Sequence, residues 1–233
     1  MCTVTFFPLK DRVVLTSNRD EKTSRPTLSP KIYQFEETKL IFPKDKQAGG
    51  TWFVAREDGT VIILLNGAFE NHRKKMGYYK SRGVVLLEVI KAENPLQFYK
   101  NMNLEGIEPF TLIYFFENNL VEMKWDEVQK YSCNLDVTEH HIWSSATLYS
   151  RAQTEIKKQW FYNFINETHT LNENKILNFH QKTQSQNKEY GLLINRNNGL
   201  KTVSVTQISI QNNAIVMKYV DVENTEIFEN IRF

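Results

Sequence analysis

Hydrophobic and polar residues alternate with a period of two over much of this chain, a pattern typical of half-buried β-strands. Near the N-terminus, residues 2–7 and 12–17 form two such runs on either side of the turn residues Lys10 and Asp11. β-Branched and aromatic residues dominate both runs, so we predict a β-hairpin. The end of its second strand should lie beside the start of its first, close to Cys2. Because side chains alternate along a strand, those of Cys2, Val4 and Phe6 should lie on one face of the first strand. Those of Thr3, Thr5 and Phe7 should lie on the other face.

Further apolar runs predict strands along the rest of the chain. These runs cover residues 40–42, 51–55, 60–65, 110–115, 120–125, 202–210 and 214–219, with another strand end at 141–145. The run at 60–65 is apolar on both faces, so we expect it at the centre of a sheet with Asn66 presented at its end. Residues 23–30 are rich in Ser, Thr and Pro and are predicted to form a loop.

Helical segments lie between these strands. The apolar run at 84–90 predicts one helix, and Asn94-Pro95 provides an N-cap and a first-turn proline for another. The sequence from Ser150 to Gln153 is a capping box before an amphipathic stripe, and Asn172 caps a last helix. Strands and helices come in blocks rather than in strict alternation. We therefore predict one α+β domain over residues 1–233, with antiparallel sheets and helices outside.

Composition excludes several classes of protein. Of the 233 residues, 41% are hydrophobic and 12% aromatic, enough for a packed core, which excludes a disordered chain. The formal net charge of +2 is too small for a nucleic-acid-binding surface, so we expect no nucleic-acid partner. The sequence lacks an apolar run of the ~18 residues that a membrane-spanning helix needs, so we expect no membrane insertion.

The cysteines and histidines narrow the chemistry further. Cys2 and Cys133 form neither a disulfide framework nor a CxxC pair, which fits a reducing compartment, and we expect Cys133 to pack in the interior. Asp11 and Asp20 interrupt the N-terminal region before an apolar signal segment develops, so we expect a cytoplasmic protein. The histidines show no ligand spacing such as HExxH, so we predict neither a metal nor another cofactor.

Cys2 is the first candidate for catalysis. Removal of Met1 would leave a thiol and a free α-amine on one residue, a nucleophile together with its base. Free groups of these kinds titrate near ~8.5 and ~7.7–8.0, so both work around neutral pH. The alternative is an ordinary buried cysteine in a strand. The predicted hairpin favours catalysis, because it returns the polar sequence Asn18-Arg19-Asp20-Glu21 to the side of Cys2.

Several landmarks together resemble the NRDE family, also called the transport and Golgi organisation protein 2 family. They are Met1-Cys2, Asn18-Arg19-Asp20-Glu21, Ala48-Gly49-Gly50-Thr51-Trp52, Asn66 and Ser81-Arg82-Gly83. Later in the chain, Trp143-Ser144-Ser145 and Thr202–Thr206 also resemble that family. Many members carry an Asn near Ala146, and this chain departs from them there.

The resemblance implies a four-layer αββα sandwich like that of N-terminal-nucleophile (Ntn) hydrolases. In the cysteine branch of those enzymes, the N-terminal Cys attacks an amide. Carried over, Cys2 would be nucleophile and base, Asp20 would orient its amine, and Asn66 would donate to the oxyanion. Arg19 would tune the thiolate or bind substrate. The remaining candidates for substrate contact are Asn18, Glu21, Trp52 and Arg82.

The same resemblance also implies a non-enzymatic alternative. Eukaryotic members are linked to haem trafficking and to lipid or acyl-CoA metabolism, so the partner would be haem or an acyl lipid rather than an amide. Arg19 and Asp20 would then pair under the hairpin as a structural feature. The basic residues His72-Arg73-Lys74-Lys75 are expected to form a solvated rim, and the alternative is that they meet an anionic group of the substrate.

Overall fold

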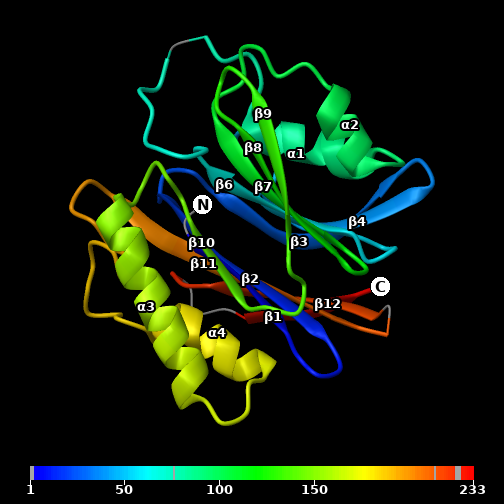
Figure 1. The fold of residues 1–233 in the computed structure, drawn as a ribbon. Helices are drawn as coiled ribbons and strands as arrows, with labels where there is room; N and C mark the ends of the chain where they lie inside the picture. The colour runs from blue at the N-terminus through cyan, green and yellow to red at the C-terminus, as the bar shows by residue number, and fades with distance from the viewer. Residues whose placement is uncertain (1–2, 76, 213, 224–226) are drawn as a thin grey trace.

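The computed structural model describes residues 3–75, 77–212, 214–223 and 227–233, which fold into two antiparallel sheets packed face to face. Figure 1 shows helices α1 (Arg82–Lys91) and α2 (Pro95–Asn101) on the outside of one sheet, and α3 (Arg151–Glu167) and α4 (Glu173–Lys182) on the outside of the other. The predicted α+β class and αββα layering are confirmed.

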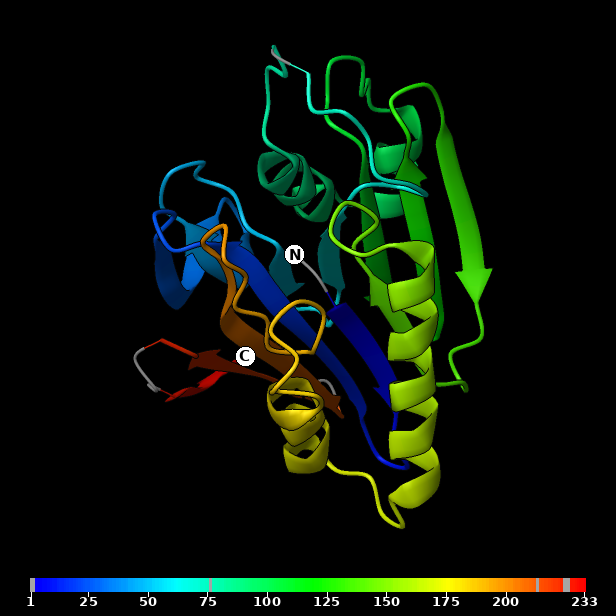
Figure 2. The same ribbon diagram turned by 90° about the vertical axis from the view of Figure 1, so that its left-hand side faces the viewer.

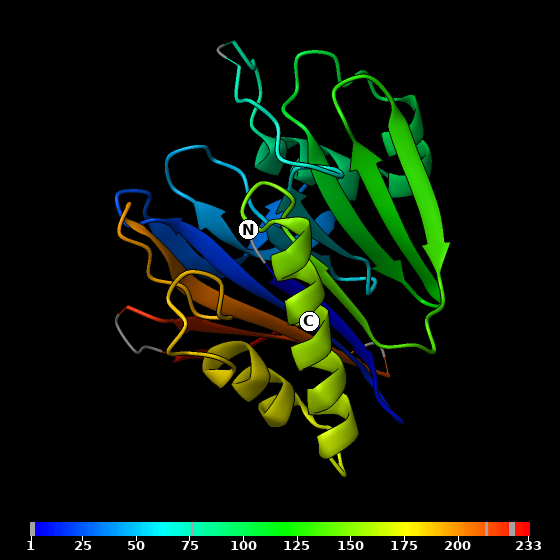
Figure 3. The same ribbon diagram turned by 60° about the vertical axis from the view of Figure 1, so that its left-hand side comes forward.

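The first sheet lies against α3 and α4 and has the strand order β10-β1-β2-β11-β12-β13. Its strands are β1 (Thr3–Pro8), β2 (Val13–Lys22), β10 (His141–Ser144), β11 (Leu200–Gln211), β12 (Ala214–Asp221) and β13 (Ile227–Arg232). The second sheet has the order β3-β4-β5-β6-β7-β8-β9. Its strands are β3 (Thr27–Phe35), β4 (Thr38–Asp45), β5 (Phe53–Arg56), β6 (Val61–Asn66), β7 (Phe110–Phe116), β8 (Asn119–Trp125) and β9 (Lys130–Leu135). Figures 2 and 3 show the same layers from two other directions.

The predicted N-terminal hairpin is confirmed for the described residues. Thr3 pairs with Asn18 of β2 on one side and with Ser144 of β10 on the other. The rings of Phe6 and Phe115 lie 5.4 Å apart between the sheets, whereas Phe7 faces α3. The alternation of the strand is therefore as predicted from Thr3 onward, and Cys2 lies outside the described residues.

Helix starts follow their sequence signals. The capping box at Ser150 is formed, because its hydroxyl accepts from the backbone N–H of Gln153 while the Gln153 side chain accepts from the backbone of Ser150. Asn94 and Asn172 also cap their helices as predicted. Local hydrogen bonding at these positions satisfies backbone donors that the first helical turn leaves free.

The strands that the sequence did not predict, β3, β9 and β13, lie at sheet edges. β3 begins at Thr27, inside the segment predicted as a loop, and it contains Pro30. An edge strand tolerates a proline because one row of its N–H groups needs no partner, and the pairing with β4 shifts register around this point. β9 and β13 have mixed composition, so the sequence did not predict them as strands.

Cys133 lies exposed on β9, so the expectation that it packs in the interior was wrong.

The described helices include none that is both long and apolar enough to cross a membrane.

Candidate functional site

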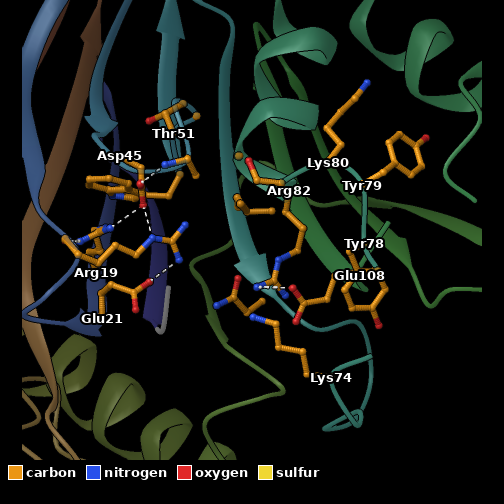
Figure 4. A pocket seen from close by; sticks show the side chains of 18 of the residues that line it. Arg19, Glu21, Asp45, Thr51, Lys74, Tyr78, Tyr79, Lys80, Arg82 and Glu108 are labelled. Carbon is orange, nitrogen blue, oxygen red and sulfur yellow. Dashed lines mark hydrogen bonds and ion pairs between the residues drawn. The ribbon is translucent and has the colours of Figure 1, made fainter. Parts of the chain in front are cut away.

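A cavity of about 620 Å³ opens where β2, the end of β4, the end of β6 and the start of α1 meet. Figure 4 shows Arg19 and Glu21 on one wall and Arg82 and Glu108 on the facing wall. The cavity collects five of the predicted site residues, namely Arg19, Glu21, Trp52, Asn66 and Arg82. Other charged residues that line it are Arg25, Asp45, Lys74, Lys75, Lys80 and Glu108.

Arg19 is held rigidly in one wall. Its side chain is almost fully buried, and its Nη2 atom donates to Asp45 at 3.0 Å. The guanidinium carbon lies 4.4 Å from the centre of the Trp52 ring, a cation–π contact. Burial lowers the pKa of Arg19 from its ordinary value, while the charges of Glu21 and Asp45 oppose that shift. The side chain stays cationic, because an arginine pKa starts so far above neutrality.

Asp45 and Glu21 also hold Arg25. The Nε atom of Arg25 lies 2.6 Å from Asp45, and its Nη1 atom lies 3.1 Å from Glu21. Asp45 therefore serves two arginines, and its other oxygen accepts from the backbone N–H groups of Gln47 and Ala48. The wall is a network of paired charges with fixed geometry, the kind of support that a positioned functional cation needs.

Arg82 faces Arg19 across the cavity as the first residue of α1. Its Nη2 lies 3.2 Å from Glu108, and its Nη1 donates to the carbonyl of Pro109 at 3.2 Å. Burial lowers the pKa of Arg82, and the charge of Glu108 counters the shift. The start of α1 packs directly on the backbone at Gly50, where a Cβ atom would lie 2.4 Å from the carbonyl carbon of Gly83. Glycine at position 50 thus allows the helix to deliver Arg82 to the cavity.

Asn66 ends the buried strand β6, as predicted, and lines the cavity. Its carbonyl accepts from the Ser145 hydroxyl at 2.9 Å, which fixes the strand end against the residue after β10. Among the described residues, its side-chain amide forms no hydrogen bond, so this N–H donor is available to a ligand. An amide with that freedom can serve as an oxyanion donor.

Asn18 and Asp20 lie on the opposite face of the first sheet from Arg19. The Asp20 carboxylate accepts from the Tyr149 hydroxyl at 2.9 Å and from Thr202 Oγ1 at 2.5 Å. Asn18 is fully buried toward α4 and donates to two backbone carbonyls. Consecutive strand residues face opposite sides, so Arg19 pairs with Asp45, which corrects the alternative that pairs Arg19 with Asp20.

Cys2, the predicted nucleophile, lies outside the described residues, but the strand that follows it in sequence is well defined. Thr3 pairs with Asn18 in β2, and the next residue of β2 is Arg19. Thr3 also pairs with Ser144 in β10, and the next residue there is Ser145, which binds Asn66. The first described residue of β1 therefore pairs with the strand that carries Arg19, and with the strand whose following residue, Ser145, binds the carbonyl of Asn66.

A second cavity of about 870 Å³ lies between the second sheet and the segment that joins β10 to α3. Leu65, adjacent to Asn66, lines it together with Trp143 and the exposed ring of Phe69. Ala146, where this chain departs from the NRDE pattern, also lines this cavity and approaches Gly67 closely. The end of β6 thus borders both cavities.

Sequence reasoning missed Asp45, which holds Arg19 and Arg25, and Glu108, which holds Arg82. Asp45 follows a predicted strand and a proline, and Glu108 lies in a connection before β7. Neither position carries a local pattern that distinguishes it from a surface acid. Only the contacts between distant segments give these residues their role.

In the described part of the chain, His, Cys, Asp and Glu form no group of three or more that could hold a metal ion.

Comparison with known proteins gives one family and several structural neighbours. The model of the family described as Transport and Golgi organisation 2 matches residues 1–226. No curated protein sequence matches the chain significantly. Among solved structures, an N-acylethanolamine-hydrolyzing acid amidase ortholog from Caenorhabditis elegans is similar with a TM-score of 0.61 at 11% identity, over 89% of this chain and 92% of that chain.

Two variants of conjugated bile acid hydrolase from Clostridium perfringens are also similar. Their TM-scores are 0.53 and 0.51 at 9% identity, and each match covers 97% of this chain and 91% of that chain. At such low identity these likenesses show the fold, which is that of Ntn hydrolases.

Proposed function

The chain belongs to the Transport and Golgi organisation 2 family, and from that membership we propose that it is a cysteine Ntn hydrolase that cleaves a non-peptide amide. The observation that carries the proposal is that Arg19 and Asn66 line one cavity, with Arg19 on a strand paired to β1 and Asn66 bound by Ser145, which follows the other strand paired to β1. The amidase and the bile acid hydrolase that share the fold support the same class of reaction.

The proposed reaction begins after removal of Met1, in a reducing cytoplasm that keeps the Cys2 thiol free. The α-amine of Cys2 accepts the thiol proton, and the sulfur forms a bond to the amide carbon while the carbonyl electron pair moves to oxygen. Asn66 donates a hydrogen bond to that oxyanion. Collapse breaks the C–N bond, and the leaving amine takes the proton back from the Cys2 ammonium. Water, deprotonated by the same amine, then hydrolyses the thioester and releases the acid.

The other residues of the first cavity would either favour the Cys2 thiolate or contact the substrate. Arg19, held by Asp45, would place a fixed positive charge that favours the Cys2 thiolate. Glu21, Trp52 and Arg82 line the walls and would contact substrate. Because the end of β6 borders both cavities, an amide held at Asn66 could extend into each of them. The substrate would then be a small molecule with groups on both sides of the scissile bond.

Asn18 and Asp20 would act from behind the first sheet rather than by touching substrate. Both are buried and hydrogen-bonded in the layer that faces α3 and α4. Their proposed role is to hold the start of β1 and the end of β2 in register. Asp20 could still orient the N-terminal amine through the groups that it binds.

A second candidate function is the binding of haem or an acyl lipid without turnover. The supporting observation is the lining of the first cavity, where basic side chains outnumber acidic ones among the described residues and Tyr78 and Tyr79 add aromatic surface. Haem and acyl-CoA both carry anionic groups that such a lining would attract.

The deciding experiment compares thiol reactivity at Cys2 with that of free cysteine. Cys133 is exposed, so the test uses the Cys133→Ala background, in which Cys2 is the remaining thiol. We expect intact mass to show loss of Met1, and we expect iodoacetamide to label Cys2 at least about tenfold faster than free cysteine at pH 7, because a tenfold rate matches a thiol pKa lowered by roughly one unit. Cys2→Ala in the same background should remain unlabelled. Retention of Met1, or labelling no faster than free cysteine, would refute the hydrolase.

The binding alternative makes a different prediction. A haem titration followed in the visible spectrum should then shift the Soret band at micromolar protein, equally in wild type and Cys2→Ala. Absence of that shift counts against haem as the ligand.

A further inference from the structure

Lys157 is a fully buried lysine in α3, directly behind the start of β1. It is 0% exposed, in a helix whose other fully buried side chain is the apolar Phe161. Its Nζ atom donates to Thr3 Oγ1 at 3.2 Å and to the carbonyl of Gly191 at 3.2 Å. Nζ also lies 3.9 Å from the centre of the Tyr149 ring. Burying an ammonium is expensive, and an apolar side chain of similar length would pack there without that penalty.

The contacts of Lys157 lead to the end of β2. Tyr149, whose ring the ammonium covers, donates its hydroxyl to Asp20 at 2.9 Å. Asp20 also accepts from Thr202, so its carboxylate is fixed on two sides. A cation and a carboxylate therefore lie together behind β1 and β2, at the level where Arg19 faces the cavity on the other side of the sheet.

His180 of α4 adds no positive charge to this layer. Burial and the charge of Lys157 lower the pKa of His180 to about 3, so the ring is neutral at physiological pH. Its Nε2 lies 2.7 Å from Thr5 Oγ1, and its Nδ1 bonds to Asn18. Among the described residues, the titratable and charged groups that face this region include Lys157 from α3, Asp20 from β2, Tyr149 from the connection before α3 and His180 from α4. Arg196, from the connection before β11, also lies here, with its guanidinium carbon 5.6 Å from the centre of the Tyr149 ring.

We infer that Lys157 is a positioning residue for the N-terminal nucleophile, an inference that rests on the proposed function. Through Thr3 it anchors the residue that follows Cys2, and it supplies a buried positive charge behind the strand start. A nearby cation disfavours a protonated amine and favours a thiolate. Lys157 would therefore lower the pKa values of both groups that Cys2 contributes, and so prepare the base and the nucleophile together.

The test measures the rate of Cys2 alkylation by iodoacetamide from pH 5 to 9 in the Cys133→Ala background. We expect Lys157→Met to raise the midpoint of this profile by about one pH unit and to slow alkylation at pH 7 up to about tenfold, the usual size of a single-charge effect. Lys157→Arg, which keeps the charge, should restore the midpoint. Circular dichroism and thermal unfolding establish that each variant is folded.

Two threonine variants keep the inference testable if Lys157→Met does not fold. Thr3→Val removes the hydroxyl that Lys157 binds, and we expect it to raise the midpoint in the same direction. Thr5→Val is the matched control on the same face of β1, because its hydroxyl bonds to His180 instead, and it should leave the midpoint unchanged.

The outcomes separate the inference from the proposed function. If Cys2 of the parent protein reacts no faster than free cysteine, the hydrolase itself is refuted, and the positioning role is refuted with it. If the parent reacts fast and a folded Lys157→Met or Thr3→Val keeps the same midpoint, Lys157 is only structural and the hydrolase proposal stands.

Discussion

The guanidinium of Arg19 and the carboxylate of Asp45 meet 3.0 Å apart across the interface between the two sheets. Arg19 belongs to β2 and Asp45 ends β4, so the pair joins the sheets at the wall of the cavity. Both side chains are almost fully buried, and Arg25 and two backbone N–H groups use the remaining capacity of Asp45. A buried pair that is satisfied in this way is sensitive to loss of either partner.

We predict that Asp45→Asn lowers the free energy of unfolding by about 3–5 kcal/mol, because it leaves the Arg19 charge buried without its partner. The amide still accepts from the backbone of Gln47 and Ala48, so the local turn is preserved. Urea unfolding measures the loss. Asp58→Asn is the control, since Asp58 pairs with Arg56 at a partly exposed site and should cost at most about 1 kcal/mol. Equal losses in the two variants would contradict the prediction.

His180 makes stability depend on pH in a defined window. Its pKa in the folded protein is about 3, below the ordinary value of 6.5, so as pH falls the unfolded chain takes up the proton first. The contribution of neutral His180 to the free energy of unfolding is complete above about pH 6.5. It is lost progressively as pH falls toward 3, by about 1.4 kcal/mol per pH unit.

Burial is the main cause of this lowered pKa and the charge of Lys157 adds to it, while the hydrogen bonds of His180 suit a neutral ring. Asn18 Nδ2 donates to two carbonyls, so Asn18 Oδ1 accepts from His180 Nδ1–H, and His180 Nε2 accepts from the Thr5 hydroxyl. We predict that His180→Gln flattens the fall in stability between pH 6.5 and 4.5, measured by urea unfolding. The exposed His169→Gln should retain the slope of the wild type. A His180→Gln slope equal to that of the wild type would refute the assignment.

The parts of the fold that sequence predicted are those with local signals. The N-terminal hairpin, the capping box at Ser150 and the central strand that ends at Asn66 all rest on neighbouring residues, and the structure has them. The edge strands β3, β9 and β13 were missed because an edge strand buries little and keeps a mixed composition.

For the site, alternation applied to β2 would have separated Arg19 from Asn18 and Asp20 before the structure was known. The partners of those residues could not be found in that way. Asp45 meets Arg19 because two sheets pack together, and Lys157 shares the buried face of α3 with Phe161, although lysine is a residue type expected at the surface. Such partners are set by contacts between residues far apart in sequence.

Gly50 should be the least replaceable glycine of the cavity wall. We predict that Gly50→Ala lowers stability by several kcal/mol or displaces α1, since its Cβ would lie 2.4 Å from the backbone of Gly83. Gly49→Ala is the matched control: its φ of 73° imposes a strain of about 1–2 kcal/mol, but the added carbon meets open space. Thermal unfolding ranks the two variants. A smaller loss for Gly50→Ala than for Gly49→Ala would show that the contact with α1 relaxes easily.

Asn66 should affect acylation of Cys2 but not its alkylation. Attack on p-nitrophenyl acetate passes through a tetrahedral oxyanion, whereas displacement of iodide from iodoacetamide forms no such charge. In the Cys133→Ala background, we therefore predict that Asn66→Ala slows acylation of Cys2 by about 10²-fold, the usual cost of one lost oxyanion donor, and leaves alkylation unchanged. Asn71→Ala, an amide in the lining of the second cavity, is the control and should alter neither rate. If Asn66→Ala slows both reactions equally, the residue shapes the thiol environment and is not an oxyanion donor; if it slows neither, Asn66 takes no part in the chemistry of Cys2.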